Sequence, residues 1–179
     1  MGVIIEESGL RFGEYDEDQV FRIETSAQYT KSLRNKGIKS CEFVLKKDSE
    51  LFFIEAKSSC PRQVTKDVPD DEKESKEKKY EEFIEEIASK MRHSLALYGN
   101  ILLKRYSQEG LTSNLADTDL SEYSIKLILV INTKDEKWTP APELRDAIEQ
   151  YLKEEIKIWK TAPFLVITQE EAREKGLIV

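Results

Sequence analysis

The amino-acid sequence predicts a single α/β domain with a central mixed β-sheet and helices on its faces. Strand-like segments are interspersed with helix-like segments along the chain, and no segment repeats. The longest helix-like segment, residues 74–106, keeps apolar residues at three-to-four spacing. Residues 125–131 form a nearly continuous apolar run, which is typical of a strand buried on both faces. The 179 residues suit one domain of ordinary size, covering 1–179.

The domain is expected to have three parts along the chain. N-terminal strands occupy residues 1–24, a core that carries a chemical motif occupies residues 25–131, and residues 132–179 supply a helix, a strand and a short helix. This order of strands and helices favours one sheet covered by helices over two separate units.

The N-terminal part reads as short strands joined by turns. Apolar or alternating residues predict strands at 3–5, 10–12 and 20–23. The acidic residues 14–18 are expected to form a solvated turn. A short helix follows at 26–35, with Thr25 or Ser26 as the capping residue and Gly37 just past its end.

Residues 41–45 and 51–57 are expected to form a β-hairpin. The link at 46–50 is short and polar, as hairpin connections usually are. Residues 58–73 then form a long loop before the helix at 74–106. A second polar loop is expected at 110–121, ahead of the apolar strand.

The C-terminal part begins with a helix whose first turn contains Pro140, a residue well placed in the first turn of a helix. That helix is expected to run to about Trp159. A last strand at 164–168 and a terminal helix at 169–175 complete the domain.

Composition and charge exclude several classes of protein. No run of about 18 apolar residues is present, and the N-terminus lacks the basic and apolar regions of a signal peptide, so we expect no membrane contact and a cytoplasmic protein. The formal net charge is −7, which argues against a large basic surface for DNA but permits a local basic groove.

Cysteine and histidine are too few for a zinc cluster. The chain has one histidine, His93, and two cysteines, Cys41 and Cys60, which we expect to be free thiols in a cytoplasmic protein. His93 lies near the apolar stripe of the long helix, which favours a structural role over general-base chemistry.

Acidic and basic residues converge where the hairpin strands meet. Glu55 and Lys57 are two residues apart on one strand and therefore share a face, with Ala56 opposite. Folding the hairpin brings Glu42 near Glu55. Two such carboxylates repel each other unless a cation or a proton relieves them, and Mg²⁺ or Mn²⁺ prefers oxygen ligands of this kind. The expected ligands are Glu42, Glu55 and the backbone carbonyl of Ala56.

This arrangement resembles the PD-(D/E)xK nuclease superfamily, whose fold is restriction-endonuclease-like. The segments that carry the resemblance are residues 38–45 and 51–59, which include Glu42 and the triplet Glu55-Ala56-Lys57. Members of the superfamily have an acidic residue on one strand and a Glu-x-Lys or Asp-x-Lys triplet on the next. The first acidic residue is usually aspartate, and here Cys41-Glu42 stands in its place.

The resemblance implies a metal-dependent hydrolase that cleaves phosphodiester bonds in DNA. Glu42 and Glu55 would bind Mg²⁺ or Mn²⁺, and Lys57 would assist the attacking water or the charge on the phosphate. Many members add a glutamate on or near the first helix, and Glu24 is the weaker candidate for that ligand. A homodimer or a protein partner is also compatible with an acidic domain of this size.

Two alternatives remain open. A catalytically inert domain of the same fold would bind a protein or nucleic-acid partner, which suits the acidic charge and the charged long helix. An unrelated α/β domain would carry the triplet by accident, with Glu55 and Lys57 forming an ordinary ion pair at a strand end.

Overall fold

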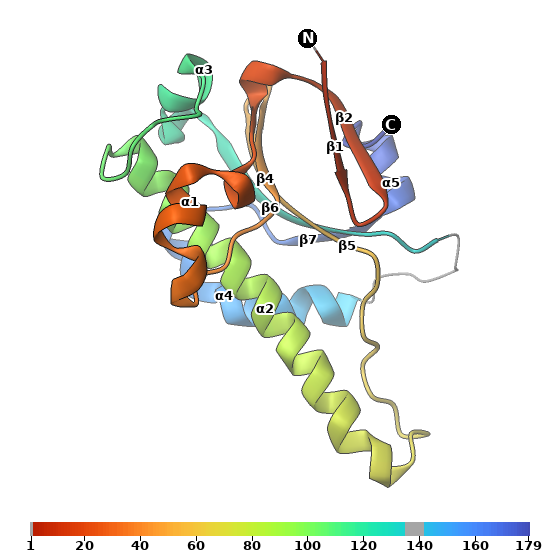
Figure 1. The fold of residues 1–179 in the computed structure, drawn as a ribbon. Helices are drawn as coiled ribbons and strands as arrows, with labels where there is room; N and C mark the ends of the chain where they lie inside the picture. Colours follow the sequence, from red (N-terminus) through yellow and green to blue (C-terminus); the bar gives the residue numbers. More distant parts are fainter. Residues whose placement is uncertain (1, 135–141) are drawn as a thin grey trace.

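A computed structural model describes residues 2–134 and 142–179 of the chain. Its centre is a five-stranded sheet with the order β3-β4-β5-β6-β7 (Figure 1). The pairs β3–β4 and β4–β5 are antiparallel, whereas β5–β6 and β6–β7 are parallel. The prediction of a mixed central sheet in an α/β domain is therefore confirmed.

The strands of this sheet lie close to the expected segments. They are β3 (Val20–Phe21), β4 (Phe43–Lys47), β5 (Glu50–Lys57), β6 (Ser124–Ile131) and β7 (Leu165–Thr168). The hairpin β4–β5 turns through Asp48 and Ser49, and Asp48 adopts a positive φ of 55°. Because the link contains only these two residues, the hairpin fixes which residues of β4 and β5 face each other.

The two N-terminal strands form a sheet of their own. β1 (Gly2–Glu7) and β2 (Leu10–Asp16) pair only with each other within the described residues, apart from a bridge between Phe12 and Ile178. The acidic turn expected at 14–18 is partly wrong, since β2 continues to Asp16 before a 3-10 helix at Glu17–Gln19. The strand expected at 20–23 is also shorter, because residues 23–25 form a second 3-10 helix.

The helices are α1 (Ala27–Ser32), α2 (Asp70–Leu102), α3 (Ser113–Ala116), α4 (Pro142–Ile158) and α5 (Gln169–Glu174). Ser26 caps α1 by accepting a hydrogen bond from the Tyr29 amide. The long helix is shifted toward the N-terminus relative to 74–106, and the loop expected at 110–121 contains α3. The expected helix start at Pro140 lies outside the described residues.

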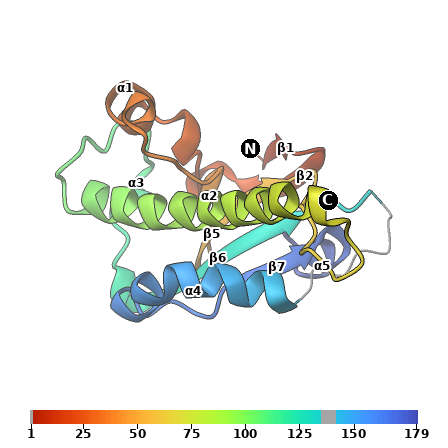
Figure 2. The ribbon, with the colours of Figure 1, turned by 90° about the horizontal axis from the view of Figure 1, so that it is seen from below.

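The central sheet separates two apolar cores. Helices α2 and α4 lie side by side over one face of the sheet (Figure 2). On one face α2 and α4 pack against Leu51 and Phe53 of β5. On the other face the β1–β2 hairpin and α5 pack against Phe52 and Ile54. This alternation follows from the two-residue period of a strand, so Glu55 faces the helices and Ala56 faces the hairpin.

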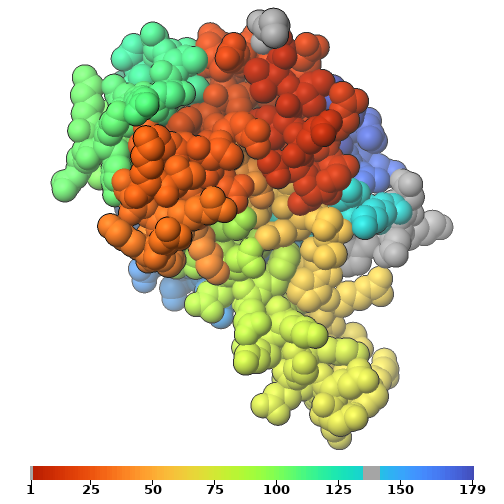
Figure 3. Space-filling view, viewed as in Figure 1, coloured from red at the N-terminus to blue at the C-terminus, as the bar shows by residue number. Residues whose placement is uncertain are grey.

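The first turns of α2 project from the body of the molecule together with the loop before them (Figure 3). Residues 70–79 are exposed, and the first buried residue of α2 is Ile84. From Ile84 onward the expected apolar stripe is confirmed, with Ile87, Met91, Leu95 and Tyr98 buried against the sheet. No helix among residues 2–134 and 142–179 is both long enough and apolar enough to span a membrane.

Candidate active site at the end of strand β5

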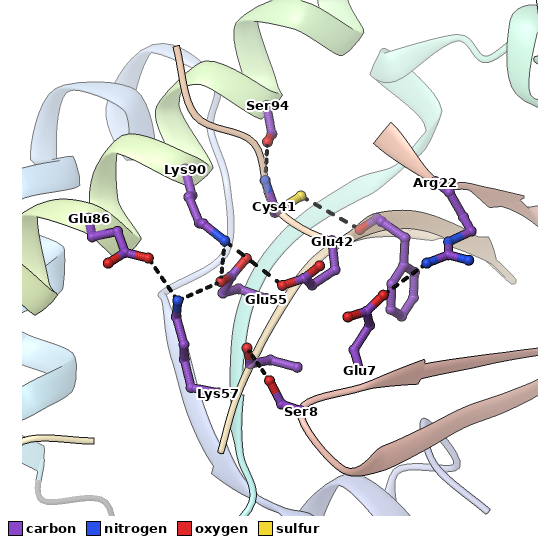
Figure 4. Close-up of polar contacts among 12 residues, drawn as sticks. Glu7, Ser8, Arg22, Cys41, Glu42, Glu55, Lys57, Glu86, Lys90 and Ser94 are labelled. Carbon is purple, nitrogen blue, oxygen red and sulfur yellow. Dashed lines mark hydrogen bonds and ion pairs between the residues drawn. The ribbon is translucent and has the colours of Figure 1, made fainter. Parts of the chain in front are cut away.

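The last residues of β5 place two charged side chains under α2 (Figure 4). The Glu55 side chain is fully buried and the Lys57 side chain is 24% exposed, with 3.4 Å between Glu55 Oε1 and Lys57 Nζ. The two residues share the helix-facing side of β5, as the sequence predicts. A buried carboxylate requires compensation, because removing it from water is costly unless it is paired or hydrogen-bonded.

Helix α2 provides that compensation through two residues one turn apart. Lys90 Nζ lies 2.7 Å from Glu55 Oε1, and Glu86 Oε1 lies 2.7 Å from Lys57 Nζ. Side chains at positions i and i+4 lie on one face of a helix, so both reach the end of β5. The four side chains form a network of ion pairs between β5 and α2, in which acidic and basic residues alternate.

Glu42 extends this network of ion pairs from the residue that precedes β4. It lies one residue before β4, so the expectation that the strand starts at Cys41 is wrong; the Cys41 amide instead donates to Ser94 Oγ. The Glu42 amide still donates to the Ile54 carbonyl at 3.0 Å, which extends the pairing and sets Glu42 beside Glu55. Lys90 Nζ is 3.8 Å from Glu42 Oε1.

Glu24 also reaches the site, from the 3-10 helix at Ile23–Thr25. Its side chain hydrogen-bonds the Glu42 carboxyl. Burial, that hydrogen bond and repulsion from Glu55 together raise the pKa of Glu42 to about 9, although Lys90 opposes the rise. A hydrogen bond between two carboxyl groups requires a proton on one of them, and the raised pKa assigns that proton to Glu42.

The pKa values of Glu55 and Lys90 are both raised, which favours a neutral Glu55 but a charged Lys90. Burial raises the pKa of Glu55, and the Lys90 and Lys57 ammonium groups counter it. Burial lowers the pKa of Lys90, but the Glu55 carboxylate outweighs burial and raises it overall. Because Lys90 touches Glu55 directly, we assign a charged Lys90–Glu55 pair with a neutral Glu42 at its edge.

The Ala56 carbonyl takes part in a different contact. It accepts a hydrogen bond from Ser8 Oγ at 3.0 Å, where Ser8 lies in the turn between β1 and β2. A carbonyl oxygen has two lone pairs and can accept from more than one partner. The N-terminal hairpin thus reaches the end of β5 from the face opposite to α2.

The donor atoms of this site match a hard divalent ion in chemistry but are not arranged around one. Glu55 Oε2 is buried and has no hydrogen-bond partner within the protein. Carboxylate and carbonyl oxygens are what Mg²⁺ and Mn²⁺ take. In the part of the chain that the structure describes, no three His, Cys, Asp or Glu side chains are grouped as a metal site requires. The Lys90 ammonium group lies between Glu42 and Glu55 and contacts both carboxyl groups.

Sequence reasoning placed Glu42, Glu55, Lys57 and Glu24 together and missed the contribution of α2. Glu86 and Lys90 are charged residues beside the buried positions Ile87 and Met91. A charged pair at i, i+4 that borders an apolar stripe is a signal that such a pair faces partly inward. The sequence does not indicate which strand such a pair meets.

His93 lies on α2, and its ring contacts the backbone of the segment before β4. His93 Nδ1 accepts a hydrogen bond from the Lys39 amide at 3.0 Å, and burial lowers the pKa of His93. Cys41 and Cys60 are both free thiols. Burial raises the pKa of each thiol to about 12, so neither is an activated nucleophile.

Comparisons with known proteins add no family to these observations. No protein-family model, no curated protein and no solved structure matches the chain. The contacts among Glu42, Glu55, Lys57, Glu86 and Lys90 are therefore the basis for assigning a function.

Proposed function

We propose that this chain is a metal-dependent phosphodiester hydrolase of the PD-(D/E)xK type with a restriction-endonuclease-like fold, acting on DNA. The observation that carries the proposal is the convergence of Glu42, Glu55 and Lys57 at one end of the β4–β5 hairpin. The order of helix α1, hairpin, helix α2 and parallel strand β6 agrees with the layout that the resemblance implies.

Each side chain would have a distinct role. Glu42 and Glu55 would hold Mg²⁺ or Mn²⁺, with the Ala56 carbonyl oxygen as a further donor and Glu24 as a supporting carboxylate. A bound ion would supply a Lewis acid that polarises a phosphate oxygen and lowers the pKa of a water molecule. Lys57, which is partly exposed, would place its ammonium group against charge that develops on the phosphate.

The proposed substrate is compatible with the acidic composition only through local contacts. Basic side chains would have to meet the phosphate backbone near the site, and Lys57 and Arg22 are partly exposed there. Arg22 is held by an ion pair with Glu7 at 2.8 Å. Free cysteines support the cytoplasm as the proposed compartment.

The test is cleavage of mixed single- and double-stranded DNA in Mn²⁺, with EDTA as the metal-free control. Lys57→Ala should lose about a hundredfold or more of the activity, because it removes a charge that stabilises the transition state. Glu86→Gln should retain most of the activity, because Glu86 touches Lys57 but no other motif residue. Lys79→Ala, an exposed change on the same helix, is the matched surface control.

Equal effects of Lys57→Ala and Glu86→Gln would contradict the proposal and identify an ordinary structural ion pair. If the wild-type protein cleaves no DNA in any condition, the second candidate function is favoured: an inert domain of this fold that binds a protein partner. One observation favours that candidate: Glu86 and Lys90 already neutralise Lys57 and Glu55 within the protein itself.

A further inference from the structure

Lys90 occupies the position between the Glu42 and Glu55 carboxyl groups in which a bound cation would contact both. Its ammonium nitrogen lies 2.7 Å from Glu55 Oε1 and 3.8 Å from Glu42 Oε1. The Lys90 side chain is only 14% exposed. Figure 4 shows the Lys90 nitrogen with contacts to both carboxyl groups.

The backbone of Lys90 is fixed because α2 is packed against the sheet at this point. The fold therefore places the Lys90 side chain beside Glu55. The neighbouring residues Ile87 and Met91 are fully buried in the core between α2 and the sheet. A lysine side chain has four rotatable carbon–carbon bonds beyond this anchored backbone, so its ammonium group can leave while the helix stays in place.

The compensation that Lys90 provides is incomplete. It brings one positive charge to the Glu42 and Glu55 carboxyl groups, and Glu42 also has the Glu24 carboxyl group as a hydrogen-bond partner. Its contact with Glu55 uses Oε1 and leaves the buried Oε2 without a partner. A divalent ion carries twice the charge and accepts more oxygen ligands than an ammonium group has protons to donate.

We infer that Lys90 is a built-in competitor of the divalent ion, which occupies the ion position and must be displaced before the ion binds. The inference rests on the proposed function for the identity of the ion site. Its consequence is opposite to that of an ordinary supporting residue: removing the Lys90 charge strengthens ion binding. A lysine that only supported the carboxylates would weaken ion binding when lost.

The test is the affinity of the intact protein for Mn²⁺ alone, measured from the electron paramagnetic resonance signal of free Mn²⁺ at about pH 8. Lys90→Met, similar in length but uncharged, should bind Mn²⁺ at least about tenfold more tightly than wild type, since a like charge in contact with the site is removed. Lys90→Arg keeps the charge and should stay within about threefold of wild type. Lys79→Met is the matched neutralisation on the exposed part of α2 and should leave the affinity unchanged.

Loss of one partner of a buried ion pair is destabilising, so folding of each variant is checked by circular dichroism and thermal unfolding. A second measurement uses the wild-type protein and therefore does not depend on the stability of a variant. The lysine side-chain NMR signals of wild type are followed during titration with Mg²⁺, with Lys90→Arg used only to assign the Lys90 signal. The Lys90 signal should change as Mg²⁺ binds, while the Lys79 signal stays unchanged.

Weaker or unchanged Mn²⁺ binding in Lys90→Met, or a Lys90 signal that is unaffected at saturating Mg²⁺, would overturn the inference. Absence of any Mn²⁺ binding in both wild type and Lys90→Met would overturn it as well. Tighter binding in Lys90→Met without cleavage of DNA by any form would uphold the inference and reject the nuclease function. The two claims are therefore separable in one set of proteins.

Discussion

The ionisation of Glu42 is strongly controlled by its surroundings. Its side chain is 10% exposed and lies among the Glu24 and Glu55 carboxyl groups. Burial and these neighbours raise its pKa to about 9 from an ordinary value of 4.5. In the folded protein without metal, Glu42 therefore keeps its proton at neutral pH, whereas the unfolded chain releases it.

This difference predicts that the metal-free protein loses stability as pH rises. Between the two pKa values the folded state binds a proton that the unfolded state has lost, so the free energy of unfolding falls by up to about 1.4 kcal/mol per pH unit. Glu42→Gln cannot titrate and should show a shallower slope. Urea unfolding from about pH 5 to about pH 9 in EDTA measures both slopes. Parallel slopes for the two proteins would show that Glu42 is ionised in the folded state.

The side chains that complete the site show what sequence reasoning reaches at the level of residues. Glu55 and Lys57 share a strand, so their common face follows from a two-residue period. Glu42 is one short hairpin away, and its approach to Glu55 was predictable. Glu86 and Lys90 are separated from β5 by a long loop, and their contacts depend on the position and rotation of α2 over the sheet. No local pattern determines those quantities.

At the scale of elements, α2 is anchored through its second half. Its start at Asp70 is favoured by three acidic residues in its first turn, which interact favourably with the positive end of the helix dipole. The apolar stripe from which the helix was predicted begins later, so the expected start was four residues too late. The helix ends at Leu102, and Lys104 leaves it with a positive φ of 58°.

Gly99 allows α2 to pack closely against α4. A Cβ at this position would lie 2.6 Å from Cη2 of Trp159, just beyond the end of α4. Gly99→Ala gains up to about 1 kcal/mol of helix propensity but costs about 1–3 kcal/mol in overpacking, so we expect a net loss of about 1 kcal/mol in urea unfolding. In a Trp159→Leu background the clash is removed, and the same change should be neutral or stabilising. A loss of equal size in both backgrounds would contradict close packing against Trp159.

At the scale of the whole molecule, the central sheet needs both of its faces covered. The N-terminal hairpin covers the face opposite to α2, and Tyr15 Oη donates a hydrogen bond to the Leu177 carbonyl near the C-terminus. The strand character of β1 and β2 was predictable from their residue patterns. Their pairing as a separate sheet was not, because it depends on contacts with segments far along the chain.

Phe12 tests how much the hairpin contributes to the fold. It is fully buried, and its ring packs edge-on against Phe43 with centroids 5.3 Å apart. Phe12→Ala should lower the free energy of unfolding by about 3–5 kcal/mol, because it leaves a cavity between the hairpin and the sheet. Ile4→Ala, at an exposed position of the same hairpin, should change it by less than about 0.5 kcal/mol. Equal effects of the two changes would indicate that the hairpin is not packed on the sheet.

The most direct test of the central claim, a divalent-ion site between Glu42 and Glu55, is X-ray diffraction from crystals soaked in Mn²⁺, using the anomalous scattering of manganese. We predict an anomalous peak in contact with both carboxylates and a Lys90 ammonium group displaced from Glu55. Crystals of Glu55→Gln should lack the peak. A wild-type map at saturating Mn²⁺ with no peak at this position, and with Lys90 still bound to Glu55, would contradict the account.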